Sequence, residues 1–325
     1  MANFYSFIDL VILSLIPLLV VSIGAMFSER GGVTNIALEG IMIFGAYIGV
    51  IILKFLEPAM ANVPQLLFLI GMIVATVAGM ALSLLHAYAS VSLNADQIIS
   101  ATALNIFAPA FSIFLTMSLN LGEKVGSDKI PVSKSLFLIK EVPLLSKIPF
   151  IGDIFFKNVY LSLYIGIIIL IASFFVLYKT RFGLRLRSCG ENPHASDAAG
   201  VNIYKIRYTG VLISGALAGM GGYFLITNFY TLFDSTVAGY GFLAMAVMIF
   251  GNWKPFRIFF AALFFSFLKV LSKGVAFIPF LERLHINSLL FDMLPFVSTL
   301  IILVFMSKTN VAPKSIGVPY DKGIR

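Results

Sequence analysis

The sequence predicts an all-α, polytopic integral membrane protein with about nine transmembrane helices, within a range of about eight to ten. The first observation is composition: 59% of the 325 residues are hydrophobic and 12% are charged, whereas about 25% are charged in an average soluble domain. The second is a mean hydropathy of +0.99. The third is that the apolar residues form blocks of about 20, the length of helix that crosses a hydrocarbon core of about 30 Å. A bilayer therefore suits this chain better than water, where exposed apolar surface costs roughly 25 cal/mol per Å².

Uncharged or nearly uncharged runs mark the candidate spans. The first run contains Pro17 and Gly24, which spanning helices tolerate because neighbouring groups satisfy the freed backbone. The N-terminus lacks a basic region followed by a small-residue cleavage site, so the first run is expected to stay as a spanning helix. In chain order the runs are residues 10–28, 36–53, 63–85, 98–122, 158–178, 208–233, 235–253, 258–268 (extending toward 272) and 289–306.

Hydrophilic stretches set the predicted topology of a single transmembrane domain over residues 1–325. Residues 179–207 carry six Lys or Arg, and residues 307–325 carry four. Because Lys and Arg accumulate on the cytoplasmic side, 179–207 is predicted to be a cytoplasmic loop and 307–325 a cytoplasmic tail. Counting spans backward makes 119–157 an extracytoplasmic loop and places the N-terminus outside.

Composition and motifs exclude several classes of function. The net charge of +8 is scattered between apolar blocks, which suits loops and membrane lipids and gives no nucleic-acid surface. Cys189 is the single cysteine, and His86, His194 and His285 lie far apart, so neither an intrachain disulfide nor a metal site is predicted. The chain has no G-x-x-x-x-G-K-[ST] phosphate loop and no H-E-x-x-H motif, so it is not predicted to be an enzyme.

The basic loop contains the signals of a short helix. Asn192 and Pro193 are typical of a helix cap and of the first helical position. An Ala-rich run follows, and Gly200 suits the left-handed conformation that ends a helix. The prediction is a helix of about two turns over 193–199, too short to be stable without neighbouring contacts. It is either a docking element for a partner protein or a connector on the membrane surface.

The residues around this short helix resemble a known family. The run GENPHASDAAGVNIYKIR from Gly190 to Arg207, followed by SGALAG at 214–219, resembles the coupling region of permeases in sugar and nucleoside ABC importers. These permeases form the branched-chain amino acid/ribose-type permease family. The resemblance implies that the short helix docks into the ATP-hydrolysing subunit. The implied coupling residues are Glu191, Asn192, Pro193, His194, Ala195, Ser196, Asp197, Gly200, Lys205 and Arg207.

Two further stretches indicate the branch of the family. Residues 29–40 (ERGGVTNIALEG) resemble the G-V-x-N-I-x-x-E-G pattern of the nucleoside and simple-sugar group. Segments 239–244 (GYGFLA) and 250–255 (FGNWKP) add to the resemblance, which covers most of the chain from about residue 20 to 306. Two departures are Gly32, where relatives often have alanine, and a longer, Lys-rich outer loop.

The resemblance implies a function as well as a fold. The chain is expected to be the permease subunit of an ABC importer in a bacterial plasma membrane, forming the pathway for nucleosides or related simple sugars. A ribose-like sugar or a branched-chain amino acid is the alternative solute. No cofactor is expected on this chain, because ATP-Mg belongs to the partner. The implied partners are two ATPase subunits, a second permease chain and an extracytoplasmic solute-binding protein.

Polar residues inside the apolar runs are candidates for the solute pathway, because polar groups at membrane depth are costly unless they line a cavity or pair internally. Uncharged amides suit neutral sugars or nucleosides, although hydrogen bonding between helices explains each of them as well. Glu39 either lines the pathway or is a helix-start carboxylate satisfied by backbone N–H groups or by Arg30. Glycines at 215, 219, 221 and 222 are interpreted as packing positions. The candidates for the pathway are Asn35, Glu39, Asn94, Gln97, Asn105 and Asn228.

A short internal match suggests an inverted repeat. Residues 41–45 (IMIFG) and 247–251 (VMIFG) share four identical residues, and the predicted topology makes them run in opposite directions. A match this short in so apolar a chain also arises by chance.

Two rival functions are weighed against the importer. An ion-coupled secondary transporter would need a titratable pair at mid-membrane, and the candidates Glu39 and Asp292 both lie near span ends. A membrane-embedded enzyme would need catalytic residues clustered on neighbouring spans, which the sequence does not offer.

Overall fold

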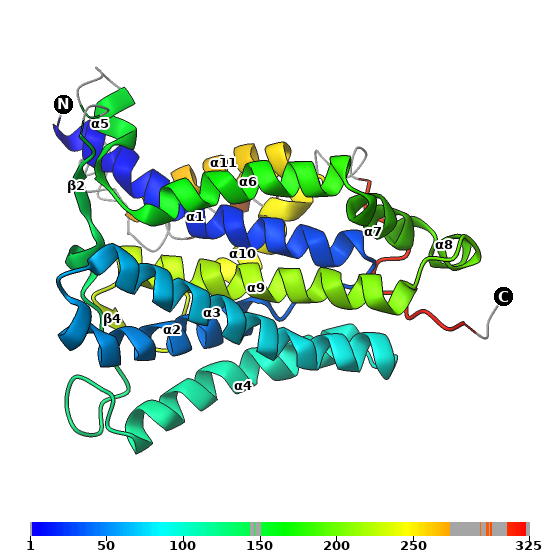
Figure 1. Cartoon of the computed structure of the whole chain (residues 1–325), viewed down its shortest axis with the longest axis horizontal. Helices are drawn as coiled ribbons and strands as arrows, with labels where there is room; N and C mark the ends of the chain where they lie inside the picture. Colours follow the sequence, from blue (N-terminus) through cyan, green and yellow to red (C-terminus); the bar gives the residue numbers. More distant parts are fainter. Residues whose placement is uncertain are drawn as a thin grey trace.

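The computed structural model describes residues 2–143, 146, 151–273, 293, 297–298, 300 and 311–322. The chain forms a bundle of long helices whose ends gather at two opposite poles (Figure 1). The N-terminal helix begins at one pole, and residues 311–322 lie at the other, beside α8. The helices are α1 Ala2–Arg30, α2 Leu38–Met60, α3 Pro64–Ala87 with a π-helical turn Tyr88–Ser92, α4 Gln97–Ser118, α5 Ile151–Phe155, α6 Leu161–Lys179, α7 Arg181–Glu191, α8 Pro193–Ala198, α9 Ile203–Phe229, α10 Tyr240–Phe250 and α11 Pro255–Lys273.

Short strands occur at the pole where the chain begins. They form two antiparallel pairs, and a 3₁₀ turn lies between β1 and β2. The pairs are β1 Ile130–Pro131 with β4 Leu232–Phe233, and β2 Ile139–Glu141 with β3 Lys157–Val159. β4 follows α9, so the first pair joins the 119–157 loop to the chain that leaves α9.

Six of the predicted spans are confirmed as helices long and apolar enough to cross a membrane: α1, α2, α3 with its π-helical turn, α4, α6 and α9. The seventh predicted run, 235–253, is helical only over the 11 residues of α10, which rise about 16 Å and reach half-way across the core. The eighth run lies within α11. Most of the ninth run, 289–306, lies outside the described residues, so the count of nine stays a prediction.

Glycines allow three helices of the core to pack backbone against backbone. A Cβ atom added to Gly79 of α3 would lie 2.3 Å from the carbonyl oxygen of Gly215 in α9. One added to Gly45 of α2 would lie 2.4 Å from Cα of Gly219. The predicted packing role of the glycines in 215–222 is therefore confirmed.

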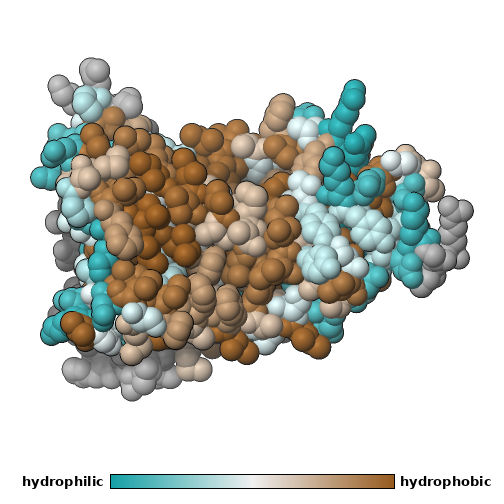
Figure 2. All heavy atoms as spheres, turned by 60° about the horizontal axis from the view of Figure 1, so that its bottom comes forward, coloured by the Kyte–Doolittle hydropathy of each residue, from teal (hydrophilic) through white to brown (hydrophobic). Residues whose placement is uncertain are grey.

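The outer surface has the polarity of a membrane protein. Figure 2 shows a hydrophobic band between hydrophilic ends on one face of the molecule. Large apolar side chains of α3 and α4 contribute to the exposed surface, among them Ile73, Ile106 and Phe114. Lipid tails are as apolar as these side chains, so the side chains can face outward without the cost of exposing apolar surface to water.

Two helices begin inside the bundle, each after a stretch of chain that turns back into it. Residues 31–37 lead from the end of α1 to the start of α2, and residues 230–239 lead from the end of α9 to the start of α10. The two helix starts meet, because the Glu39 carboxylate accepts hydrogen bonds from the amides of Gly239 and Gly241. α10 then runs to the pole that holds α8, where Trp253 contacts the end of α1.

This junction lies between the poles: α10 rises about 16 Å from it, and the 23 residues of α2 rise about 35 Å. α2 and α10 leave it in opposite directions, in agreement with the inverted orientation expected of 41–45 and 247–251. The match itself is out of register, however. It begins three residues after the start of α2 at Leu38 but seven residues after the start of α10 at Tyr240. The four identical residues therefore do not mark equivalent positions of a repeat.

Candidate docking surface and solute pathway

The short predicted helix is present as α8, which projects with α7 beyond the long helices at one pole (Figure 1). Asn192 caps it, with its Oδ1 accepting from the Ala195 amide at 3.0 Å. The Ser196 hydroxyl donates to the Asn192 carbonyl at 2.9 Å. Gly200 ends the helical turn with a φ of +81° and donates to the Asp197 carbonyl at 2.8 Å. The local cap and stop signals in the sequence are enough to define this element.

The predicted coupling residues divide into an outward set and a buried set. Pro193, Ser196 and Arg207 are buried, and Asp197 is half-buried. Arg207 lies on α9, which begins at Ile203 because Asn202 accepts from the Lys205 amide at 2.9 Å. The outward set that a partner can touch is Glu191, Asn192, His194, Ala195, Gly200 and Lys205.

α7 is an element that the sequence reasoning missed. Thr180 caps it by accepting from the Gly183 amide at 3.1 Å, while Leu186 and Cys189 are buried and its arginines face outward or sideways. The spacing of Phe182, Leu186 and Cys189 is helical and follows a threonine cap. This threonine cap and helical spacing lie between the predicted span 158–178 and the Asn192 cap, and they are the sequence signal for α7.

The end of α7, directly before α8, is packed closely against the end of α1. A Cβ atom on Gly190 would lie 2.3 Å from the carbonyl oxygen of Arg30, at the end of α1. The Arg30 guanidinium donates to the Trp253 carbonyl from Nε at 3.2 Å and from Nη2 at 3.0 Å. The Trp253 indole in turn donates to Glu29 at 2.7 Å. Movement of α8 can therefore reach α1 through the end of α7, and the end of α10 through Glu29 and Arg30 of α1.

Glu39 is the residue that joins the starts of α2 and α10. Its Oε1 accepts from the Gly239 amide at 2.8 Å and its Oε2 from the Gly241 amide at 2.7 Å. Lys269 of α11 donates to the Ala238 carbonyl at 3.1 Å beside this junction. Of the two interpretations of Glu39 as a helix-start carboxylate, backbone satisfaction is therefore correct and Arg30 is not its partner. The amides belong to α10 and not to the helix that carries Glu39.

Predicted pathway residues hold the stretch 31–37 in place. Asn35 donates from Nδ2 to the Ser214 hydroxyl at 2.9 Å, and the Thr34 amide donates to Gln97 Oε1 at 2.8 Å. Asn35 Oδ1 and Gln97 Nε2 are buried with no hydrogen-bond partner among the described residues. These two atoms keep hydrogen-bonding capacity that the described part of the protein does not use.

Two more side chains complete this network. Asn105 accepts from the Gly40 amide at 2.7 Å and donates to the Ile36 carbonyl at 3.0 Å. His86, which sequence reasoning did not select, lies 3.0 Å from the Thr34 carbonyl through Nε2 and 3.0 Å from Ser100 through Nδ1. Because a carbonyl can only accept, Nε2 carries the proton. A lone histidine in an apolar run gives no sequence signal for such a role.

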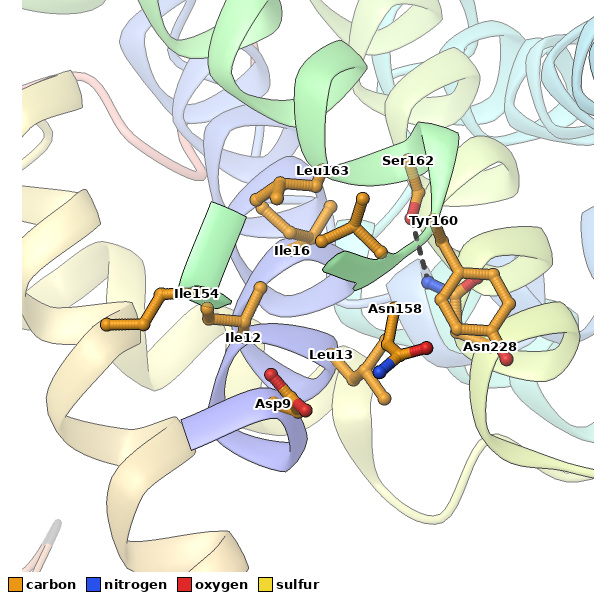
Figure 3. A pocket seen from close by; sticks show the side chains of 11 residues that line it. Asp9, Ile12, Leu13, Ile16, Ile154, Asn158, Tyr160, Ser162, Leu163 and Asn228 are labelled. Atoms are coloured by element: carbon orange, nitrogen blue, oxygen red, sulfur yellow. Dashed lines mark hydrogen bonds between the residues drawn. The ribbon is translucent and has the colours of Figure 1, made fainter. Parts of the chain in front are cut away.

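The remaining two predicted residues lie at the poles. Asn94 is exposed in the turn before α4, with a φ of +51°. Asn228 is buried near the opposite pole, donates to the Ser162 hydroxyl at 2.9 Å and leaves its Oδ1 without a partner among the described residues. It lines a small cleft of about 10 Å³ with Asp9 and Tyr160 (Figure 3). The structure therefore brings Asn35, Glu39, Gln97 and Asn105 to one region and leaves these two apart.

Comparison with known proteins identifies the family. Residues 7–305 match the family described as "Branched-chain amino acid transport system / permease component". The chain is 40% identical over 314 residues to the nucleoside ABC transporter permease protein NupC of Lactococcus lactis, covering 94% of this chain and 93% of that protein. It is 40% identical over 311 residues to the guanosine ABC transporter permease protein NupQ of Bacillus subtilis, covering 95% of this chain and 94% of that protein.

A second permease of Lactococcus lactis is also similar to the chain. The nucleoside ABC transporter permease protein NupB is 27% identical over 266 residues, covering 80% of this chain and 70% of that protein. No solved structure matches the chain at a significant level. With its family match over most of the sequence, the chain belongs to the permease components of the branched-chain amino acid transport type.

Proposed function

We propose that this chain is the permease subunit of an ABC importer for nucleosides. The observation that carries the proposal is 40% identity, over 94% and 95% of the chain, to two permeases whose names specify nucleosides and guanosine. This identity favours nucleosides over the alternatives of a ribose-like sugar or a branched-chain amino acid. It also favours an ATP-driven importer over the ion-coupled alternative.

The pole that holds α8 is proposed to face the cytoplasm and to bind the ATPase subunits. The six Lys or Arg of 179–207 support that orientation, which puts the N-terminus outside and the 119–157 loop on the extracytoplasmic side. ATP-Mg and its hydrolysis belong to the ATPase. This chain converts the movement of α8, through α7 and its contact with the end of α1, into a change of the pathway.

A second permease and a solute-binding protein complete the proposed assembly. The occurrence of NupB and NupC in one organism supports a pair of unlike permeases, with a homodimer as the alternative. An extracytoplasmic protein would deliver the nucleoside to the pole where α1 begins.

The solute pathway is proposed to pass the junction of α2 and α10. Helices that begin inside the bundle, as α2 and α10 do, expose polar backbone only where a cavity or buried protein accommodates it. The spare atoms of Asn35 and Gln97 suit the hydroxyl and amide groups of a neutral nucleoside. Asn228 and Asn94 would then meet the solute at the two mouths of the pathway and not at its centre.

Loss of ATPase binding tests the docking assignment. The detergent-solubilised chain should recover an ATPase subunit in a pull-down, and a Gly/Ser linker in place of 192–200 should abolish that recovery. The same linker in place of 123–129, in the outer loop, is the control and should leave recovery intact. Continued binding after replacement of 192–200 would show that the docking assignment is wrong, and uptake that persists without the ATPase would favour the ion-coupled alternative.

The identity of the solute is tested on the cognate binding protein. Thermal-shift screening against nucleosides, ribose and branched-chain amino acids should give stabilisation by nucleosides, because a ligand that binds only the folded state raises the melting temperature. Stabilisation by amino acids alone would contradict the nucleoside assignment.

A further inference from the structure

Residues 311–322, predicted as a plain tail, are built into the pole that holds α8. The Ser315 amide donates to the Gly190 carbonyl at 2.8 Å. The Tyr320 ring is only 3% exposed and lies 5.2 Å from the His194 ring of α8 and 5.7 Å from the Tyr204 ring of α9. Aromatic pairs at these distances contribute beyond simple burial. The segment therefore fixes α8 against α9 from the side.

The same segment covers Arg207. This guanidinium is 1% exposed and donates from Nη1 to the Val318 carbonyl at 3.0 Å. A buried charge is costly unless polar groups compensate it, so the Val318 carbonyl is part of what allows Arg207 to sit there. Arg207 cannot reach a partner protein from this position. Its contribution to the predicted coupling region is its contact with residues 311–322.

Residues 311–322 also contact the chain just before α2 and just after α10. The Gly317 amide donates to the Gly32 carbonyl at 3.1 Å, at the start of the stretch before α2. The Val311 amide donates to Asn252 Oδ1 at 3.2 Å, just after α10. One segment thus connects α8 to the approach of α2 and to the end of α10.

A groove beside α8 is shared with this segment. It has a volume of about 460 Å³ and is lined by residues of α8, of α9 and of the turn between them, including Asp197, Asn202 and Tyr204, and by Lys322. A carboxylate, amide, phenol and ammonium at its rim suit a polar protein segment of mixed charge and not a lipid tail. A protein that binds α8 therefore meets the C-terminal segment at the same time.

We propose that the ATPase subunit binds a composite surface made of α8 and residues 311–322, and that this segment carries the movement of α8 to the approach of α2 and the end of α10. This inference rests on the proposed function, because it names a second part of the ATPase-binding surface. It gives the C-terminal segment a role in both binding and coupling.

Variants of Tyr320 test the composite surface. Tyr320→Ala removes both ring contacts and should lower the affinity for the ATPase at least about tenfold, whereas Tyr320→Phe keeps them and should stay within about twofold of wild type. Val125→Ala is the control, because its side chain is 92% exposed in the outer loop and lies outside the proposed surface. At saturating ATPase, the solute transported per ATP hydrolysed should remain low in Tyr320→Ala. Unchanged affinity overturns the composite surface, and full recovery of that ratio overturns the coupling role.

A proximity measurement keeps the inference testable if Tyr320→Ala does not fold. A cysteine at Lys322 should cross-link to the ATPase with a short bis-maleimide, and a cysteine at Val125, which is 92% exposed in the outer loop, should not. Absence of a cross-link at Lys322 overturns the inference. If replacement of 192–200 still releases the ATPase in that case, the proposed function stands and the composite surface alone is wrong.

Discussion

At the scale of single residues, Glu39 joins the starts of α2 and α10. Its two oxygens satisfy two amides that start another helix, Gly239 and Gly241. Helix N-termini favour a carboxylate because their amides and dipole are positive. The sequence motif that contains Glu39 pointed to the residue, but the partner lies 200 positions away, a distance over which local patterns carry no information.

Substitution of Glu39 should therefore weaken the junction of α2 and α10, and the effect should grow with the number of hydrogen-bond acceptors removed. Glu39→Ala leaves the buried Gly241 amide and the half-buried Gly239 amide without this acceptor, at up to about 1–3 kcal/mol each, so it should lower the melting temperature in detergent and abolish uptake. Glu39→Gln retains one acceptor and should lose less of both. Melting temperature and nucleoside uptake in proteoliposomes with the ATPase measure these effects. A Glu39→Ala protein as stable and active as wild type would show that the junction is dispensable.

At the scale of elements, the sequence predicted the long helices well and their starts and breaks less well. Hydropathy measures whether a run is apolar and does not report direction or conformation, so it predicts one span over 235–253 although residues up to Gly239 are not helical. The sequence predicts the start of α9 five residues late, at Tyr208, because the charges of Lys205 and Arg207 favour a loop. Arg207 is instead buried on α9, a position that only the C-terminal segment explains.

The candidate site was predictable to a different degree in its two parts. α8 is defined by adjacent residues, Asn192 to Gly200, and could be predicted from them. The candidate pathway residues share only a polar side chain in an apolar run, a property that does not distinguish the central Asn35 from Asn94 at the edge of the bundle. Contacts between distant helices decide that difference.

The contact between α3 and α9 gives a prediction at the element scale. Gly79→Leu puts a side chain where the Gly215 carbonyl already lies within 2.3 Å of a Cβ atom, so the helices must separate. Overpacking typically costs about 1–3 kcal/mol, and more where backbone opposes it, so this variant should give little monodisperse protein by size-exclusion chromatography. Ala103→Leu makes a comparable change at an exposed position of α4 and should behave as wild type. Equal yields of the two variants would contradict the close packing.

At the scale of the whole molecule, opposite poles hold the start of α1 and residues 311–322 (Figure 1), so the orientation of one pole fixes the other. The six Lys or Arg of 179–207 favour the cytoplasm for the α8 pole. In right-side-out vesicles, a cysteine at Val125 should therefore react with a membrane-impermeant maleimide. A cysteine at the exposed Lys205 should react only after permeabilisation.

The native cysteine does not obscure this measurement. Burial raises the pKa of the Cys189 thiol to about 11, so about one thiol in a thousand is ionised at pH 8 and the buried sulfur stays unreactive until the chain unfolds. Labelling of the wild-type chain should appear only in denaturant, which provides the internal control. The reverse pattern, with Lys205 labelled from outside and Val125 protected, would show that the orientation in the membrane is the opposite of the predicted one. It would then leave α8 on the wrong side of the membrane for an ATPase, and the docking proposal would fail with the orientation.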